Sequence, residues 1–166
     1  MLRNINQIDD CQLKYSRLSR FSFSLSDCQL LQSRVDELYN ELISKGFLFF
    51  KPKVYIGEEW CSIEGTLTIF IPFYLLHKRL MDFERKISGK VEGGNKAWCM
   101  RLLRHEAGHC FDHAFNLSKR RDWRQLFGNP GEKYDPDSYS INKKSKNYVI
   151  NLEEHYAQSH PCEDFA

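Results

Sequence analysis

The stretch Leu103–Phe111 reads "LRHEAGHCF" and decides which fold to expect, because it holds two histidines four residues apart with a glutamate directly after the first. On an α-helix, side chains at these positions project from one face a single turn apart, so both imidazoles can reach one metal ion. A five-residue pattern of this kind also occurs by chance. Its interpretation therefore depends on the rest of the chain.

The composition indicates one globular domain spanning residues 1–166, because 42% of the residues are hydrophobic and the chain is long enough to bury a core. The 24 basic and 22 acidic residues give a formal net charge of +2, which offers no electrostatic argument for a nucleic acid or an anionic membrane as partner. The longest apolar run, Leu67–Leu76, is about half a membrane span, so we expect no transmembrane segment.

The cysteines and the start of the chain predict a cytoplasmic protein. None of the six cysteines belongs to a C-x-x-C pair, and the first ten residues, "MLRNINQIDD", contain no apolar run typical of a secretion signal. We therefore expect the thiols to be reduced.

Hydrophobic periodicity and turn-forming residues predict an α+β domain. Short strands are expected at Lys53–Ile56 and Thr66–Ile71, joined by a turn-like segment, and Pro72 ends the second because it lacks an amide hydrogen. The segment Gly128–Asn151 is polar and rich in turn formers. Helices are predicted at Asp27–Lys45, with a capping box at Ser26 and Gln29 and a stop at Gly46, and at Tyr74–Ile87, Asn95–Leu117 and Lys119–Phe127.

The predicted helix Asn95–Leu117 places His105 and His109 on the side away from its apolar arc, with Glu106 at the edge of that side. This weakens the interpretation of the two histidines as core residues, and two surface histidines remain an alternative. The arc consists of Met100, Leu103, Ala107, Cys110, Phe111, Ala114 and Phe115.

The predicted helix Lys119–Phe127 carries a run of basic residues, a pattern more typical of a solvated face than of a nucleic-acid site. Trp123, Leu126 and Phe127 are expected to anchor this helix to the core. We therefore expect no nucleic acid as a partner.

A catalytic zinc site takes three protein ligands and keeps one position for water. Glu106, next to the first histidine, is positioned to act as the general base that takes the proton of that water. The third ligand must come from elsewhere, and His113 lies too far along the same helix to join both histidines at one ion. The downstream candidates are Asp112, His113, His155, His160, Glu163 and Asp164, and spacing favours the C-terminal segment.

Three blocks of sequence resemble a bacterial family of zinc-binding metallopeptidases. They are "IPFYLLHKRL" (Ile71–Leu80), "VEGGNKAWCMRLLRHEAGHCFDHAF" (Val91–Phe115) and "HYAQSHPCEDFA" (His155–Ala166). The last block is also similar to the corresponding segment of a gluzincin. In gluzincins a glutamate on a second helix completes the zinc site. The resemblance implies a zincin-like metallopeptidase domain, with a small sheet beside an active-site helix and a peptide or protein as substrate.

The resemblance also implies a set of roles. His105, His109 and Glu163 would bind zinc, Glu106 would act as the general base, and Tyr156 would donate a hydrogen bond to the oxyanion of the transition state. Asp164 is the main alternative to Glu163, and a zinc-binding structural or regulatory domain without turnover is the alternative function.

Two further expectations concern the edges of the domain. The family pattern continues beyond Ala166, so we expect this chain to lack a C-terminal helix and its last turn to be marginal. The strand Thr66–Ile71 is expected to be either an edge strand that pairs with an extended peptide or a plain core strand.

Overall fold

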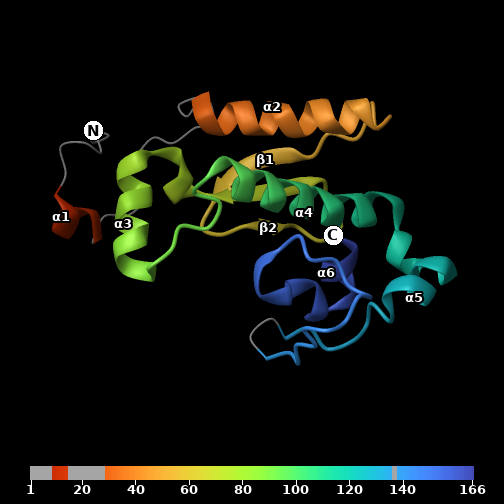
Figure 1. Ribbon diagram of the computed structural model, residues 1–166. Helices are drawn as coiled ribbons and strands as arrows, with labels where there is room; N and C mark the ends of the chain where they lie inside the picture. The colour runs from red at the N-terminus through yellow and green to blue at the C-terminus, as the bar shows by residue number, and fades with distance from the viewer. Residues whose placement is uncertain (1–8, 15–28, 136–137) are drawn as a thin grey trace.

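The structure is a computed structural model that describes residues 9–14, 29–135 and 138–166. It is an α+β arrangement of a small sheet and several helices (Figure 1), so the predicted fold class is confirmed. The predicted cap of the first helix at Ser26 lies outside the described residues. In chain order the elements are α1 (Asp10–Lys14), α2 (Gln29–Ser44), β1 (Lys53–Gly57), β2 (Cys61–Ser62), β3 (Thr68–Pro72), η4 (Phe73–Leu76), α3 (Lys78–Ser88), α4 (Lys96–Phe115), η5 (Leu117–Lys119), α5 (Arg121–Phe127), η6 (Glu153–Gln158) and α6 (Pro161–Phe165).

The sheet has the strand order β1-β3-β2, with β1 parallel and β2 antiparallel to β3. β3 is therefore the central strand, so of the two alternatives for Thr66–Ile71 the core strand is confirmed and the edge strand is wrong. Among the described strands β1 and β2 are the edges, and β2 lies in the segment predicted to be a turn. A two-residue strand has no periodicity that a sequence pattern could reveal.

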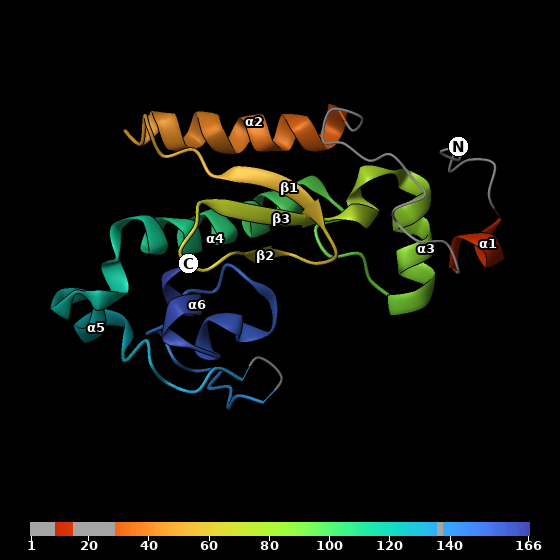
Figure 2. The ribbon, with the colours of Figure 1, turned by 180° about the vertical axis from the view of Figure 1, so that it is seen from behind.

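Helix α4 covers one face of the sheet, and α2 runs beside β1 (Figures 1 and 2). The side chains of Ile69 and Ile71 point from β3 into this interface and are fully buried. Burial of aliphatic and aromatic side chains between these layers supplies the main stabilising force of the domain. The core consists of Leu31, Val35, Leu38, Phe50, Ile69, Ile71, Leu75, Leu76, Val91, Cys99, Met100, Leu103, Ala107 and Cys110.

Both ends of helix α4 lie within two residues of the predicted bounds. They could be predicted because an asparagine marks each end of the helix. The side chain of Asn95 accepts a hydrogen bond from the backbone N–H of Trp98 at 2.9 Å, which caps the first turn. Asn116 adopts the left-handed conformation, with φ of 52°, and ends the helix. Gly46, with φ of 91°, likewise follows the end of α2, as predicted.

The predicted helix Tyr74–Ile87 is interrupted. η4 ends at Leu76, and His77 has an extended backbone conformation before α3 begins at Lys78. The Nδ1 atom of His77 accepts a hydrogen bond from the backbone N–H of Arg79, so this side chain starts a new helix. The two pieces bury different clusters: Leu75 and Leu76 of η4 belong to the main core, whereas Leu80 of α3 packs with Leu13.

Helix α5 is anchored by Trp123, which is 4% exposed. The ring centroid of Trp123 lies 5.1 Å from that of Phe127 and 5.9 Å from that of Phe165. Leu126 is 78% exposed, so the prediction that it anchors the helix is wrong. Trp123 and Phe127 both pack on Phe165, and Leu126 lies about 100° round the helix from Phe127, toward solvent.

Replacing Trp123 by alanine should therefore lower the free energy of unfolding by about 3–5 kcal/mol, because a large buried side chain is lost. The matched change Leu126→Ala should cost less than about 0.5 kcal/mol. Urea unfolding followed by circular dichroism measures both. Equal losses for the two variants would contradict the orientation of α5.

Candidate metal centre

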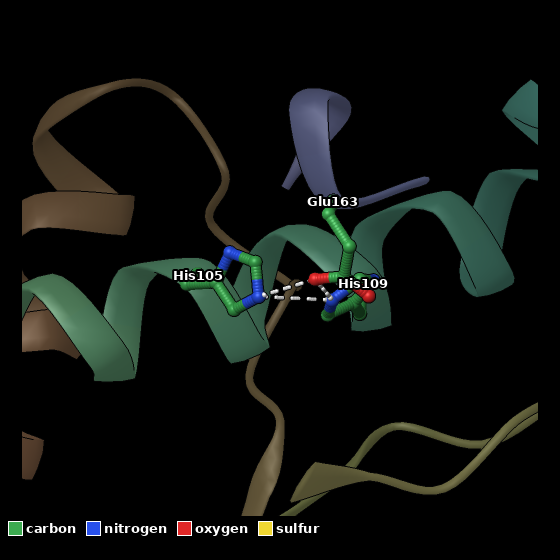
Figure 3. A group of neighbouring side chains, drawn as sticks. All are labelled: His105, His109 and Glu163. Atoms are coloured by element: carbon green, nitrogen blue, oxygen red, sulfur yellow. Dashed lines mark hydrogen bonds and ion pairs between the residues drawn. The ribbon is translucent and has the colours of Figure 1, made fainter. Parts of the chain in front are cut away.

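Three side chains converge between α4 and α6 (Figure 3). The Nε2 atoms of His105 and His109 are 3.1 Å apart, and they lie 2.9 and 3.2 Å from Oε2 of Glu163. The exposed fraction of the side chain is 8% for His105, 16% for His109 and 9% for Glu163. Among the described residues, these three form a group that could hold a metal ion.

The spacing of the three atoms fits a small metal ion. Around a tetrahedral zinc ion with ligands about 2.0–2.1 Å away, neighbouring ligand atoms lie about 3.3 Å apart. The observed separations of 2.9, 3.1 and 3.2 Å are close to that value. When their Nε2 atoms carry no hydrogen, the two imidazoles and the carboxylate oxygen all offer lone pairs that a cation between them would accept.

Even without a cation, the negative charge of Glu163 and the positive charge of His109 each stabilise the other. Burial raises the pKa of Glu163, but hydrogen bonds from His105 and His109 outweigh burial and lower this pKa to about 2. Burial lowers the pKa of His105. For His109 the hydrogen bond and the negative charge of Glu163 outweigh burial, so its pKa is raised. Glu163 is therefore held as a carboxylate, the form that binds metal ions.

The histidines are buried by the C-terminal segment rather than by the core. His105 is 7% exposed, whereas a helix with one apolar arc would leave this side in solvent. α4 is covered on its other side by α6 and η6, which lie below it in Figure 1. Neither the core nor the surface interpretation of these histidines describes them, because α4 is buried on two sides.

Helix α6 places Glu163 by local capping and by packing. His160 is the N-cap residue, and its Nδ1 atom accepts a hydrogen bond from the backbone N–H of Cys162 at 3.2 Å. Pro161 occupies the first turn, where a missing N–H costs nothing. The ring of Phe165 packs on that of Phe127, with centroids 5.4 Å apart. The last turn therefore has tertiary contacts with α5, and its marginal stability stays a prediction.

A glycine in the motif permits this packing. A Cβ atom on Gly108 would lie 2.7 Å from the backbone oxygen of Ala166, closer than such atoms approach in folded proteins. Gly108 therefore lets the end of the chain lie directly on α4. Gly108, which lies between the two histidines in the sequence, is thus part of the contact that brings Glu163 to the site.

The other candidate ligands have different contacts. Oδ1 of Asp164 accepts a hydrogen bond from the backbone N–H of Val149 at 2.9 Å, and Oδ1 of Asp112 accepts one from Ser118 at 2.6 Å. Both carboxylates therefore brace loops. His160 caps α6, and His155 has a positive φ of 55° within η6. The group contains Glu163 and excludes Asp164, although no bound ion tests the role of either.

Glu106 lies beside the three convergent side chains and is 5% exposed. Burial raises its pKa to about 7, whereas the positive charge of His109 and a hydrogen bond with Ser62 act in the opposite direction. Ser62 belongs to the edge strand β2 and lines the same cleft as Glu106, so the sheet and α4 both border this carboxyl. A carboxyl group in such surroundings can accept and release a proton near neutral pH.

Two tyrosines line the same site. Tyr156, from η6, has its ring centroid 6.2 Å from that of His105, and its hydroxyl is hydrogen-bonded to the hydroxyl of Tyr134. Burial is the largest cause of a raised pKa at Tyr156, so its phenol stays protonated. Tyr134 was missed by sequence reasoning, because it lies in a long polar loop where no periodicity singles out one residue.

A cleft of about 740 Å³ opens over this site. Its lining comes from β2 and its flanks, from the segment before α4, from α4 itself, and from described residues between 130 and 163. The lining includes all five residues predicted for the site. It consists of Trp60, Cys61, Ser62, Glu64, Lys90, Glu92, Trp98, Leu102, His105, Glu106, His109, His113, Pro130, Tyr134, Tyr139, Leu152, Glu153, Glu154, Tyr156, His160, Cys162 and Glu163.

No protein-family model, no curated protein and no solved structure matches the chain. The resemblance to metallopeptidases and the zincin-like fold thus remain predictions, and function must be inferred from the site itself. In the part of the chain that the structure describes, no helix combines the length and apolar character needed to span a membrane. Cys61, Cys110 and Cys162 are free thiols.

The two neighbouring acids of α6 provide a matched test of the ligand set. Glu163→Gln should weaken zinc affinity by more than about a hundredfold, exceeding the 10–100-fold typical of residues that only support a ligand. Asp164→Asn should leave zinc affinity nearly unchanged, because an amide oxygen can still accept the hydrogen bond from Val149. Competition with a chromophoric chelator measures both affinities. A larger loss for the Asp164 variant would exclude Glu163 as the third ligand.

Proposed function

We propose that the protein is a zinc-dependent metallopeptidase of the zincin type, which hydrolyses peptide bonds in a protein or peptide substrate. The observation that carries this proposal is the convergence of His105, His109 and Glu163 beside the buried carboxyl of Glu106, at the floor of an open cleft. Three ligands leave one position of a tetrahedral ion free for water, which distinguishes a catalytic zinc site from a closed structural one.

Zinc suits the donor set, because two imidazole nitrogens and one carboxylate oxygen are ligands that this ion commonly takes in hydrolytic enzymes. When bound, zinc would supply Lewis acidity, lowering the pKa of a water molecule toward about 7 and polarising the substrate carbonyl. All other steps fall to side chains of this chain.

Glu106 is the general base of the proposed reaction. Its carboxylate would take the proton of the attacking water and deliver it to the nitrogen of the leaving amine, so that peptide and water give an acid and an amine. The side chain is 5% exposed, which restricts the orientation of this group. Tyr156 would donate its hydroxyl hydrogen to the oxyanion, after releasing its hydrogen bond with Tyr134.

The edge of β2 is the proposed binding place for the substrate backbone. Among the described strands β2 pairs only with β3, so its other edge is available, and both of its residues line the cleft. An extended peptide can add to such an edge through backbone hydrogen bonds that do not depend on its sequence. β2 thus takes the role that the sequence suggested for the strand Thr66–Ile71.

The charge of the cleft favours basic substrates. Glu64, Glu92, Glu153 and Glu154 line it, and Lys90 is the one lysine among the described lining residues, with its Nζ 4.0 Å from Oε1 of Glu154. The chain as a whole has a formal charge of +2, so this negative charge is local. Cleft walls of one sign concentrate ligands of the opposite sign.

The role of the base can be tested with Glu106→Gln. This variant keeps the size and much of the hydrogen bonding of the side chain but removes the base, so hydrolysis should fall by at least about a hundredfold. Zinc content should stay near one ion per chain. The assay is digestion of a peptide library with mass-spectrometric detection of products, and Glu58→Gln, a change of an exposed glutamate outside the cleft, is the control.

Two outcomes would count against the proposal. Wild-type turnover in the Glu106 variant would remove this residue from the mechanism. Stoichiometric zinc without cleavage by the wild-type protein would favour a zinc-binding structural or regulatory domain.

Cleavage sites should be enriched in lysine and arginine near the scissile bond. The value of kcat/KM for such a peptide should fall severalfold when ionic strength rises from about 0.05 M to about 0.5 M, because salt screens charges more than a few ångströms apart. The double change Glu92→Gln and Glu153→Gln should reduce both the preference and its salt dependence. Library digestion and steady-state kinetics measure these effects, and a preference for acidic peptides would contradict the assignment.

A further inference from the structure

The connection between α2 and β1 contains a tight turn whose tip is apolar. The backbone N–H of Phe50 donates to the oxygen of Phe47 at 3.3 Å, so residues 47–50 form a β-turn with Leu48 and Phe49 at its centre. Glycine, proline, asparagine, aspartate and serine are the usual residues of such turns. Leu48 is 63% exposed and Phe49 is 97% exposed. Neither turn geometry nor core packing accounts for two large apolar side chains at this place.

The first and last residues of the turn fix it to the helices behind it. The ring centroid of Phe111 in α4 lies 5.0 Å from that of Phe47 and 5.1 Å from that of Phe50. The backbone N–H of Phe47 also donates to the oxygen of Leu42 at 3.0 Å, across the left-handed Gly46, which is the Schellman pattern at the end of a helix. The two central residues are therefore held outward on a supported base.

Positive charge lies on both sides of the turn. Residues 42–57 contain no aspartate or glutamate. The Nζ atom of Lys51 lies 4.6 Å from the ring centroid of Tyr39, which keeps this side chain near α2. The flanking lysines, one before the turn and two after it, are all exposed: Lys45, Lys51 and Lys53.

Further positive charge lies at the same end of the molecule. The loop after α2, the C-terminal end of α4 and helix α5 lie together at the end opposite α3 (Figures 1 and 2). Lys119 and Arg121, at the start of α5, are exposed. Glu41, the acid of α2 that precedes the turn, is paired with Arg104 at 2.7 Å.

A bilayer surface with anionic headgroups matches both features of the turn. Exposed phenylalanine and leucine side chains enter the boundary between headgroups and acyl chains, and nearby cations bind the headgroups. Lysine suits this arrangement because its apolar stem can lie along the boundary while its ammonium group stays in water. A convex tip cannot enclose a small ligand, but it can enter a lipid layer. The formal net charge of +2 conceals this feature because it averages a basic turn with an acidic cleft.

We propose that residues 45–53 dock the protein on an anionic lipid bilayer, with Leu48 and Phe49 inserted at the interface and the three lysines against the headgroups. No residue of this segment lines the cleft, so docking leaves the cleft open to a substrate. The docking surface does not depend on the metal centre or on peptide hydrolysis.

The test is flotation of the full chain with lipid vesicles in a density gradient. Vesicles of equal parts phosphatidylcholine and phosphatidylserine should carry the protein upward, whereas vesicles of phosphatidylcholine alone should carry far less. Binding to the mixed vesicles should weaken as ionic strength rises, because salt screens the attraction between lysines and headgroups.

The apolar tip is tested with Phe49→Ser. The partition coefficient for the mixed vesicles should fall by about tenfold, because less apolar area can be buried at the interface. Ile87→Ser is the matched control, since Ile87 is 61% exposed in α3 at the opposite end of the molecule, and its effect should stay within about twofold. Both variants should keep the melting temperature of the wild type, because the side chains that change are exposed.

The flanking charge is tested with the double change Lys51→Gln and Lys53→Gln. Each lysine near an anionic surface strengthens binding by about fivefold, so the double variant should lose well over tenfold in partition coefficient. Lys143→Gln with Lys144→Gln is the control, because these two exposed lysines lie in the polar segment after α5. The control should bind the mixed vesicles within about twofold of the wild type.

The outcomes decide for or against this surface. Flotation that is lost in both test variants and kept in both controls supports the proposal. Absence of flotation with either vesicle, equal flotation with both, or test variants that float like the wild type would overturn it. A wild-type chain that does not float but forms a dimer, which Phe49→Ser dissociates in analytical ultracentrifugation, would assign the turn to a contact between two copies instead.

Discussion

The contact between Glu163 and the two histidines of α4 is the interaction on which the arrangement of this molecule depends. It joins the last element of the chain to the central helix through atoms 2.9 and 3.2 Å apart. A buried carboxylate is costly unless opposite or hydrogen-bonding groups face it. Here two imidazoles face it, and a metal ion would complete the compensation. The C-terminal segment is thereby directed to one place on α4 and to no other.

That contact requires α4 to be buried on two sides. One side supplies Leu103, Ala107 and Cys110 to the hydrophobic core, and the other supplies His105 and Glu106 to the metal centre. A helix with a single apolar stripe cannot serve both functions. Gly108 is the structural adaptation that permits them, because the absence of a side chain lets the end of the chain lie on the helix between the two histidines.

The loop before α6 adds chemistry as well as cover. The hydroxyl of its Tyr134 is hydrogen-bonded to that of Tyr156, while His160 ties its backbone to the helix cap. Around this polar centre the cleft walls carry an excess of carboxylates, although the whole chain is weakly basic. Charge that is concentrated in one cleft selects ligands there without a large net charge. The contacts of Tyr134 and His160 and the carboxylates of the cleft walls arise from segments whose sequences, taken singly, look like ordinary polar loops.

The sequence by itself determined the elements whose signals are local. The position of α4, the stop of α2 at Gly46 and the α+β class follow from apolar periodicity, capping residues and turn residues, and the spacing of His105 and His109 follows from helix geometry. Only the tertiary structure decided that β3 is central, that Leu126 is exposed, and that Tyr134 and Ser62 reach the site. These depend on contacts between segments far apart in the chain, and no pattern within one segment encodes which distant backbone will lie beside it.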